Sequence, residues 1–388
     1  MNAIPATTTV AIVGAGPAGL TAGIALADAG VDVVLLDRLA EGANTSRAAV
    51  VHARTLEVLE RFGITDEMRE RGIVVPHFVM RDGERAIVEI SFDKLPSAYP
   101  YTLMIGQETT EAILLARLEK AGGSVHRPYE VTGLTQDENG ATLNYTGPDG
   151  AGSLRADYVI GADGMHSKVR EAVSIAFTGA SYPESFVLAD VRMTWPDARD
   201  QVALHLSPEG VTVIAPLPDE AGDRYRVVAT LADAPEKPNL QEVQAILTAR
   251  RPASNVQVHE VLWSSRFRVH HRVADQYRAN RVFLAGDAAH VHSPAGGQGM
   301  NTGIQDAAFL GDVLARTVHG EPNLLDTYEQ TRRPVALRVV SFTDRVTRMA
   351  TLRPAPARQL RNLLLSTVTR IPAVRRTLAF RIAELDNR

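Results

Sequence analysis

Glycine residues recur at positions 14–19 of this sequence, in the stretch GAGPAG, where they could hold a phosphorylated ligand. The residues before them are mainly β-branched and predict a strand, whereas the Ala- and Leu-rich residues after them predict a helix. In that context Gly14 permits a tight turn, Gly16 lets the backbone approach a pyrophosphate, and Gly19 lets the helix pack closely. The free amide groups of the helix N-terminus also favour phosphate charge. The stretch therefore predicts a dinucleotide-binding site.

A second apolar stretch ends in an acidic residue at the distance expected for contact with a nucleotide ribose. Residues 31–36 predict the next strand, and Asp37 follows that strand directly. A carboxylate at this place accepts hydrogen bonds from a free ribose hydroxyl pair, which favours FAD or NAD over NADP. These residues alone do not choose between FAD and NAD.

The composition limits the classes of protein that the chain can belong to. With 388 residues the chain is long enough for two or three domains, and 45% hydrophobic residues with 22% charged residues are typical of a globular protein. A net charge of −4 gives no indication of a nucleic-acid partner. The absence of cysteine excludes thiol catalysis and disulfides. No basic residue precedes Arg38 and no apolar run reaches membrane-spanning length, so we expect a cytoplasmic protein.

Changes in hydrophobic periodicity along the chain predict an α/β fold with three regions. A Rossmann-like nucleotide-binding domain is expected to be discontinuous and to comprise residues 1–73, 104–176 and 273–330. An inserted, mostly antiparallel β-sheet domain that binds substrate is expected to comprise residues 74–103 and 177–272. The remaining residues, 331–388, are expected to be helical. We further expect a helix from about Thr302 to Val318, and helix breaks at Pro334, Pro354 and Pro372.

Three separated motifs together resemble the class A FAD-dependent monooxygenases, the aromatic hydroxylases of the p-hydroxybenzoate hydroxylase type. The motifs are GAGPAG at 14–19, GADGMHSKVR at 161–170 and GDAAHVHSPAGGQGMN at 286–301. The run SRAAVVHARTLEVL at 46–59 is similar to the phenol and polyketide hydroxylase branch. The resemblance covers the chain from about Val10 to about Pro334. Because the sequence ends at Arg388, we expect no C-terminal thioredoxin-like domain of the kind found in that branch.

The resemblance implies a role in FAD binding for residues in each motif. Asp287 is expected to bind the ribityl chain, whereas Arg47 and Pro294 are expected near the isoalloxazine ring. A glycine turn that opens a helix also presents N–H groups where the reduced ring gathers negative charge. The residues that we expect to bind the cofactor are Gly14, Gly16, Pro17, Ala18, Gly19, Asp37, Arg38, Arg47, Gln107, Asp163, Gly286, Asp287, Pro294, Gly297, Gly299, Met300 and Asn301.

The reaction implied by the resemblance is hydroxylation of a phenolic or polycyclic aromatic substrate. NADPH or NADH would reduce FAD, and O2 would then form a flavin C4a-hydroperoxide that transfers one oxygen atom. The chemistry belongs to the cofactor, so no side chain need act as a nucleophile, and the sequence does not identify a general base. No nearby Asp or Glu completes a facial triad with the HxH pair His290 and His292, so we expect no metal.

Other functions and one aspect of assembly stay open at this stage. The chain could instead be a flavin-dependent reductase or dehydrogenase of an unsaturated substrate, or a non-catalytic flavin-binding protein. The partners that we expect are a small aromatic substrate and O2, without nucleic acid and without a membrane span. A homodimer is an open alternative to a monomer.

Overall fold

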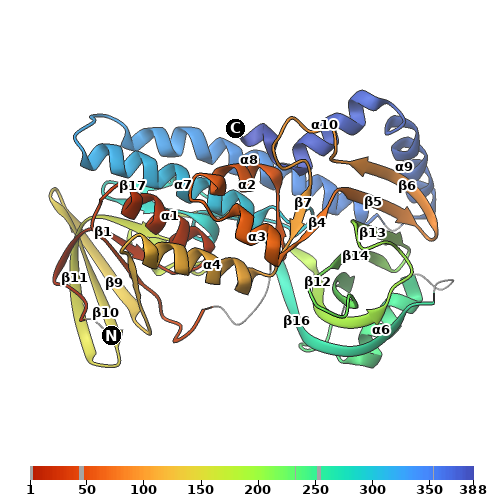
Figure 1. Cartoon of the computed structure of the whole chain (residues 1–388), viewed down its shortest axis with the longest axis horizontal. Helices are drawn as coiled ribbons and strands as arrows, with labels where there is room; N and C mark the ends of the chain where they lie inside the picture. Colours follow the sequence, from red (N-terminus) through yellow and green to blue (C-terminus); the bar gives the residue numbers. More distant parts are fainter. Residues whose placement is uncertain (1–2, 43–47, 232, 251–254, 353) are drawn as a thin grey trace.

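The computed structural model describes residues 3–42, 48–231, 233–250, 255–352 and 354–388. Within these ranges the chain forms two eight-stranded sheets, one three-stranded sheet and the helices that cover them. Figure 1 shows the two large sheets toward opposite ends of the molecule's long axis. The mixed α/β fold predicted from the sequence is confirmed.

The first large sheet has a parallel centre, as expected for a nucleotide-binding domain. β1 pairs in parallel with β2 and β11, and these two strands pair in parallel with β8 and β18 respectively. β9 and β10 extend the sheet antiparallel to β11, and β17 pairs antiparallel with β18. The strands are β1 (Thr7–Val13), β2 (Val33–Leu36), β8 (Ser124–His126), β9 (Glu130–Asp137), β10 (Gly140–Gly147), β11 (Gly150–Gly161), β17 (Arg278–Ala279) and β18 (Val282–Leu284).

Closely packed helices cover this sheet, with α1 in contact with both α4 and α7. Small residues make the contact between α1 and α7 close, since a Cβ added at Gly311 would lie 2.5 Å from the Cβ of Ala25. The strands beneath are fully buried at Ile12, Leu35 and Ile160. The helical segments on this side are α1 (Pro17–Asp28), α4 (Gln107–Lys120), α5 (Lys168–Ala172), η1 (Gly286–Ala288) and α7 (Gly299–Val318).

The second large sheet is antiparallel except where β13 pairs in parallel with β5. Its order is β19-β16-β12-β15-β14-β13-β5-β6, so the early hairpin β5–β6 joins strands that come more than a hundred residues later. One helix, α6 (Leu240–Arg250), interrupts these strands in the sequence. The strands are β5 (His77–Asp82), β6 (Arg85–Ser91), β12 (Phe177–Thr194), β13 (Gln201–Ser207), β14 (Gly210–Pro216), β15 (Arg224–Leu231), β16 (Gln257–Ala274) and β19 (His290–Val291).

A small antiparallel sheet connects the two large ones, with β7 in its centre. It consists of β3 (Val50–Val51), β7 (Thr102–Met104) and β4 (Ile73–Val75). Two short helices lie between its strands in the sequence, α2 (Ala53–Glu60) and α3 (Thr65–Arg71). The structure thus places β4 and β7 in a separate sheet from β5 and β6. The proposed division into three domains stays a prediction.

The C-terminal region is helical, but one predicted break is wrong. Pro354 and Pro372 stand at helix starts, whereas Pro334 lies inside α8. The residues before Pro334 are anchored elsewhere, since Arg332 contacts Asp306 at 2.5 Å and Arg333 donates to the Ala274 carbonyl oxygen at 3.1 Å. These contacts hold the helix through the proline. The elements are α8 (Leu325–Ala350), α9 (Ala355–Val368), α10 (Pro372–Ile382) and η2 (Leu385–Asn387).

A second correction concerns the start of α7, which begins at Gly299 and not near Thr302. The side chain of Asn301 donates to the carbonyl oxygen of Gly297 at 2.8 Å, so the last residues of the glycine turn already form the first helical turn. In the part of the chain that the structure describes, no helix is both long and apolar enough to span a bilayer.

Candidate active site

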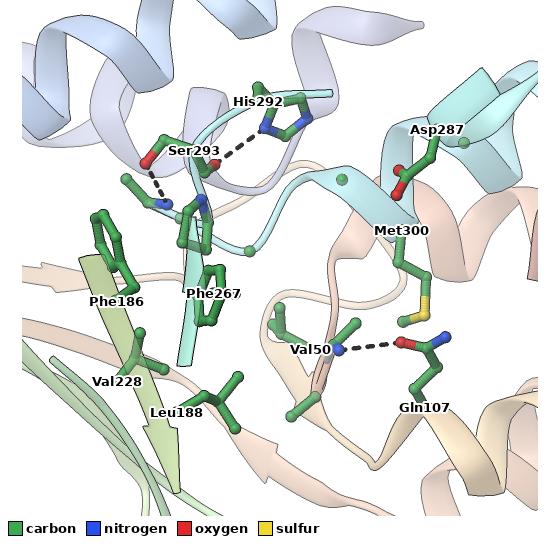
Figure 2. A pocket seen from close by; sticks show the side chains of 18 of the residues that line it. Val50, Gln107, Phe186, Leu188, Val228, Phe267, Asp287, His292, Ser293 and Met300 are labelled. Atoms are coloured by element: carbon green, nitrogen blue, oxygen red, sulfur yellow. Dashed lines mark hydrogen bonds between the residues drawn. The ribbon is translucent and has the colours of Figure 1, made fainter. Parts of the chain in front are cut away.

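One large cavity, of about 780 Å³, is lined by residues from all three sheets. Its nucleotide end lies at the β1–α1 turn, and its other end reaches the apolar face of the second large sheet. Figure 2 shows part of this cavity, with Asp287, Met300 and Gln107 on one side and Phe186, Phe267 and Val228 on the other. The cavity therefore joins the predicted cofactor site to a separate apolar chamber.

The first glycine turn has the geometry that the sequence predicted. Gly14 has φ of +100°, and a Cβ there would lie 2.3 Å from the carbonyl oxygen of Ala162. A Cβ on Gly19 would lie 1.9 Å from the carbonyl oxygen of Gly14, so α1 packs directly against the turn. A Cβ on Gly16 would meet no atom within 4 Å, because this residue faces the cavity. The turn thus leaves open space in front of the α1 N-terminus, where a pyrophosphate fits.

Asp37 fixes this turn as well as lining the cavity. One carboxylate oxygen accepts a hydrogen bond from the backbone N–H of Ala15 at 2.7 Å, and the other accepts from that of Leu39 at 2.8 Å. The neighbouring Arg38 is exposed and also lines the cavity. The structure therefore gives Asp37 a structural role that the sequence did not indicate, beside its predicted place near the ribose.

The motif at residues 286–290 places one exposed carboxylate at the end of a buried strand. Gly286 has φ of +60° and is buried, while Asp287 is exposed and lines the cavity. Asp163 also lines the cavity, but its carboxylate accepts from Ser167 Oγ at 2.5 Å and from the Lys168 N–H at 2.7 Å. Asp287 thus lies exposed at the cavity surface, whereas Asp163 caps the N-terminus of α5.

The second glycine turn, residues 294–301, is held by side chains from the β3–α2 segment and by its own asparagine. His52 Nε2 lies 2.7 Å from the carbonyl oxygen of Gly296. Asn301 accepts from the His52 N–H at 2.8 Å and donates to the carbonyl oxygens of Val50 at 2.9 Å and Gly297 at 2.8 Å. Gly297 packs so tightly that a Cβ there would lie 2.1 Å from Val50 Cγ1. These contacts fix the turn in front of the α7 N-terminus.

Burial keeps the two histidines beside this turn uncharged. It lowers the pKa of His52 to about 4, although the hydrogen bond to the Gly296 carbonyl oxygen opposes that shift. Burial likewise lowers the pKa of His292 to about 4, with a further contribution from His290. Both imidazoles are therefore neutral at pH 7. His290 Nε2 lies 2.7 Å from a carboxylate oxygen of the buried Asp306.

The chamber at the second sheet is mainly apolar. Figure 2 shows Phe186, Leu188, Val228 and Phe267 on its wall. The rings of Phe186 and Phe267 stack with their centroids 5.6 Å apart. The buried Arg226 also lines the cavity, and its guanidinium forms two hydrogen bonds to Asp190, at 2.7 and 2.9 Å. A flat apolar molecule fits such a wall better than a charged one does.

Most of the residues predicted to bind the cofactor meet at this cavity. Arg47 lies outside the described residues. Gly19 and Asn301 do not line the cavity and act through the turns that they support. The predicted residues that line it are Gly14, Gly16, Pro17, Ala18, Asp37, Arg38, Gln107, Asp163, Gly286, Asp287, Pro294, Gly297, Gly299 and Met300.

Several lining residues were missed from the sequence, chiefly His52, His292, Ser293 and Thr347. His52 lies within the SRAAVVHARTLEVL run, so that motif was the available signal. The buried Thr347 Oγ1 donates to Ser293 Oγ at 2.7 Å, which fixes the residue before Pro294 from α8. No local pattern could have identified that pair.

The two glycine turns and the shared cavity define a dinucleotide-binding flavoprotein. The profile of the family described as "FAD binding domain" matches residues 7–343. The chain belongs to this family, the FAD-dependent aromatic monooxygenases. It is accordingly an enzyme that binds FAD, takes electrons from NAD(P)H and hydroxylates an aromatic substrate.

Three relatives illustrate how far the likeness extends. The 12-dehydrotetracycline 5-monooxygenase/anhydrotetracycline 6-monooxygenase of Streptomyces rimosus is 36% identical, over 98% of this chain and 76% of its own length. Pentachlorophenol 4-monooxygenase of Sphingobium chlorophenolicum is 36% identical, over 86% of this chain and 63% of its own. The crystal structure of p-nitrophenol 4-monooxygenase from Pseudomonas putida has a TM-score of 0.87 and 28% identity, covering 98% of this chain and 99% of that one.

Proposed function

We propose that this enzyme hydroxylates a phenolic or polycyclic aromatic compound bound in the apolar chamber. The observation that carries the proposal is the continuity of the cavity from the first glycine turn to the stacked Phe186 and Phe267. The relatives named after tetracycline, pentachlorophenol and p-nitrophenol substrates support the same class.

The residues of the chain would bind FAD at both ends of the cofactor. The α1 N-terminus and Gly16 would receive the pyrophosphate, Asp37 and Arg38 the adenosine side, and Asp287 the ribityl chain. When bound, FAD reduced by NAD(P)H activates O2 for insertion of one oxygen atom into the substrate. The N–H groups at the start of α7 would face the ring edge on which negative charge develops.

The chain's second contribution would be exclusion of water from the reacting positions. The wall formed by Phe186, Leu188, Val228 and Phe267 offers no hydrogen-bonding side chain, so an aromatic substrate would displace water there. His52 and Asn301 hold the glycine turn, and Thr347 holds Ser293 next to Pro294. The protein would thus orient the substrate and exclude water, without supplying a nucleophilic side chain.

The test is aerobic NADPH and NADH oxidation by the FAD-loaded enzyme with a panel of phenols, naphthols and small polyketide aromatics. The expected result is ligand-stimulated oxidation with a product one oxygen atom heavier, labelled when the oxygen is ¹⁸O2. Stimulated oxidation that yields only unlabelled products would contradict the proposal and favour a reductase. The same assay identifies the preferred nucleotide. A cytoplasmic location and a homodimer stay predictions.

A further inference from the structure

Helix α9 (Ala355–Val368) exposes three of its four leucines to solvent. Leu360, Leu363 and Leu364 are 57%, 64% and 54% exposed, and Val368 and Ile371 continue the stripe at 42% and 52%. Leu360, Leu364 and Val368 follow one another at spacings of four with Leu363 beside them, so these four share one side of α9, and Ile371 continues the exposed row just before α10. We call these five residues the leucine face.

Arg361 and Asn362 lie on the inner side of α9, whereas Gln359 and Thr367 are exposed. Arg361 is only 6% exposed, and its guanidinium donates to the Met349 carbonyl oxygen at 3.1 Å, at the end of α8. Asn362 donates to a carboxylate oxygen of Asp82 on β5. The helix thus exposes most of its leucines and buries an arginine, whereas an ordinary surface helix buries its apolar side. An exposed aliphatic stripe of this kind indicates a partner surface.

The charge around the leucine face limits what that partner can be. Residues 345–383 contain nine arginines and no lysine, aspartate or glutamate. Arg370, Arg375 and Arg376 are exposed on α10 and the turn before it. The carboxylate in contact with α9, that of Asp82, comes from the β5–β6 hairpin and pairs with Asn362. Of the nine arginines, Arg361 is buried and Arg348 pairs with Asp344, so the positive charge beside the leucine face comes mainly from exposed arginines such as Arg370, Arg375 and Arg376.

A second copy of the chain would fit this surface poorly. A two-fold interface places each patch against its own equivalent, so exposed arginines would face arginines. An anionic bilayer surface instead accepts both features, because leucines enter the acyl boundary while arginines contact phosphate head groups. We propose that the leucine face and its flanking arginines dock the enzyme on the surface of an anionic lipid bilayer.

The position of the face gives the docking a consequence for substrate access. Figure 1 shows α9 at the outer end of the molecule, beside β6. The inner side of the same helices reaches the active-site cavity, since Leu365, Leu378 and Ile382 line it. Docking would therefore place the apolar chamber one helix away from the lipid. This consequence rests on the proposed function, whereas the docking itself does not.

The test is co-sedimentation of the FAD-loaded enzyme with vesicles. We expect binding to vesicles of equal parts phosphatidylglycerol and phosphatidylcholine, and at least tenfold weaker binding to phosphatidylcholine alone. The double variant Leu363→Gln/Leu364→Gln is expected to bind anionic vesicles at least tenfold more weakly. Arg375→Gln/Arg376→Gln is expected to weaken binding by about fivefold per arginine, and added salt should act in the same direction.

Leu262→Gln on β16 is the matched control, because Leu262 is 39% exposed at a distant place in the fold and should leave vesicle binding unchanged. Absent binding, or equal binding by the wild-type protein and the leucine variant, would overturn the proposal. Sedimentation velocity without lipid tests the alternative that a second copy of the chain binds the leucine face. A dimer that dissociates in Leu363→Gln/Leu364→Gln would assign the leucine face to a second copy. Neither measurement involves turnover, so their outcome is independent of the hydroxylation assay.

Discussion

The two glycine turns of the active site open helices in similar ways but are stabilised differently. The turn at 14–19 is held mainly by backbone packing, with Gly14 against Ala162 and Gly19 against Gly14. The turn at 294–301 depends on side chains, namely His52, Asn301 and, through Ser293, Thr347. In the first turn, the fit comes mostly from missing side chains, with the Asp37 carboxylate as an additional anchor. In the second, side chains far apart in the sequence supply it.

This difference predicts different sensitivities to mutation. Adding an atom to the backbone-packed turn should displace main chain, which has no alternative rotamer and cannot relax locally. Removing a side chain from the second turn should cost the hydrogen bonds that the side chain makes. Four predictions follow this comparison, from the largest expected effect to the smallest.

The largest effect is expected for Gly19→Ala. Its Cβ would lie 1.9 Å from the Gly14 carbonyl oxygen, so the turn or α1 must move. We expect the free energy of unfolding to fall by more than about 3 kcal/mol, measured by urea denaturation. Gly16→Ala is the matched control, because its Cβ meets no atom within 4 Å. That variant should keep its stability within about 0.5 kcal/mol but bind FAD more weakly. Equal stability of the two variants would contradict the packing argument.

The next effect is expected for Asn301→Ala in the second turn. The fully buried side chain makes three hydrogen bonds, and its loss leaves the His52 N–H and two carbonyl oxygens without this partner. We expect destabilisation of about 2–3 kcal/mol and faster loss of FAD on dilution, followed by flavin fluorescence. Asn144→Ala, on an exposed position of β10, should change neither quantity. Unaltered FAD retention in Asn301→Ala would mean that the hydrogen bonds of Asn301 do not contribute to FAD binding.

His52 should make stability depend on pH. Its folded pKa of about 4 lies below the value of 6.5 for an exposed histidine, so the unfolded state binds the proton first as pH falls. The stabilisation is therefore fully present above pH 6.5 and is lost progressively between pH 6.5 and 4, by about 2–3 kcal/mol. Urea denaturation across this range should show a shallower pH dependence in His52→Gln. The same pH dependence of the free energy of unfolding in both proteins would show that His52 is not its cause.

The smallest effect is expected for Thr347→Val, which keeps the shape of the side chain and removes its hydrogen bond to Ser293. The expected loss of stability is about 1 kcal/mol. A more sensitive readout is the fraction of NADPH oxidation that yields hydroxylated product, which should fall if Ser293 shifts beside Pro294. Thr317→Val is the control, because the hydroxyl of Thr317 donates only to the carbonyl oxygen of Val313 within α7. A similar product fraction in both variants would indicate that Thr347 has only a packing role.

The sequence by itself determined the features that depend on local spacing. The strand, turn and helix around residues 14–19, the acid at Asp37 and the second glycine turn were all predicted, and the structure places them at one cavity. Such turns are specified by residues within a few positions of one another, since φ angles and close backbone approaches are local properties. The family resemblance rested on the same motifs.

Only the tertiary structure decided how these motifs are held. His52 reaches Gly296, Thr347 reaches Ser293, and α8 continues through Pro334, because segments distant in the sequence pack together. The sequence likewise did not show that the leucine face is exposed. A helical leucine pattern identifies an apolar side of a helix but not what that side contacts. Contacts between distant residues depend on the path of the whole chain, and local periodicity does not encode that path.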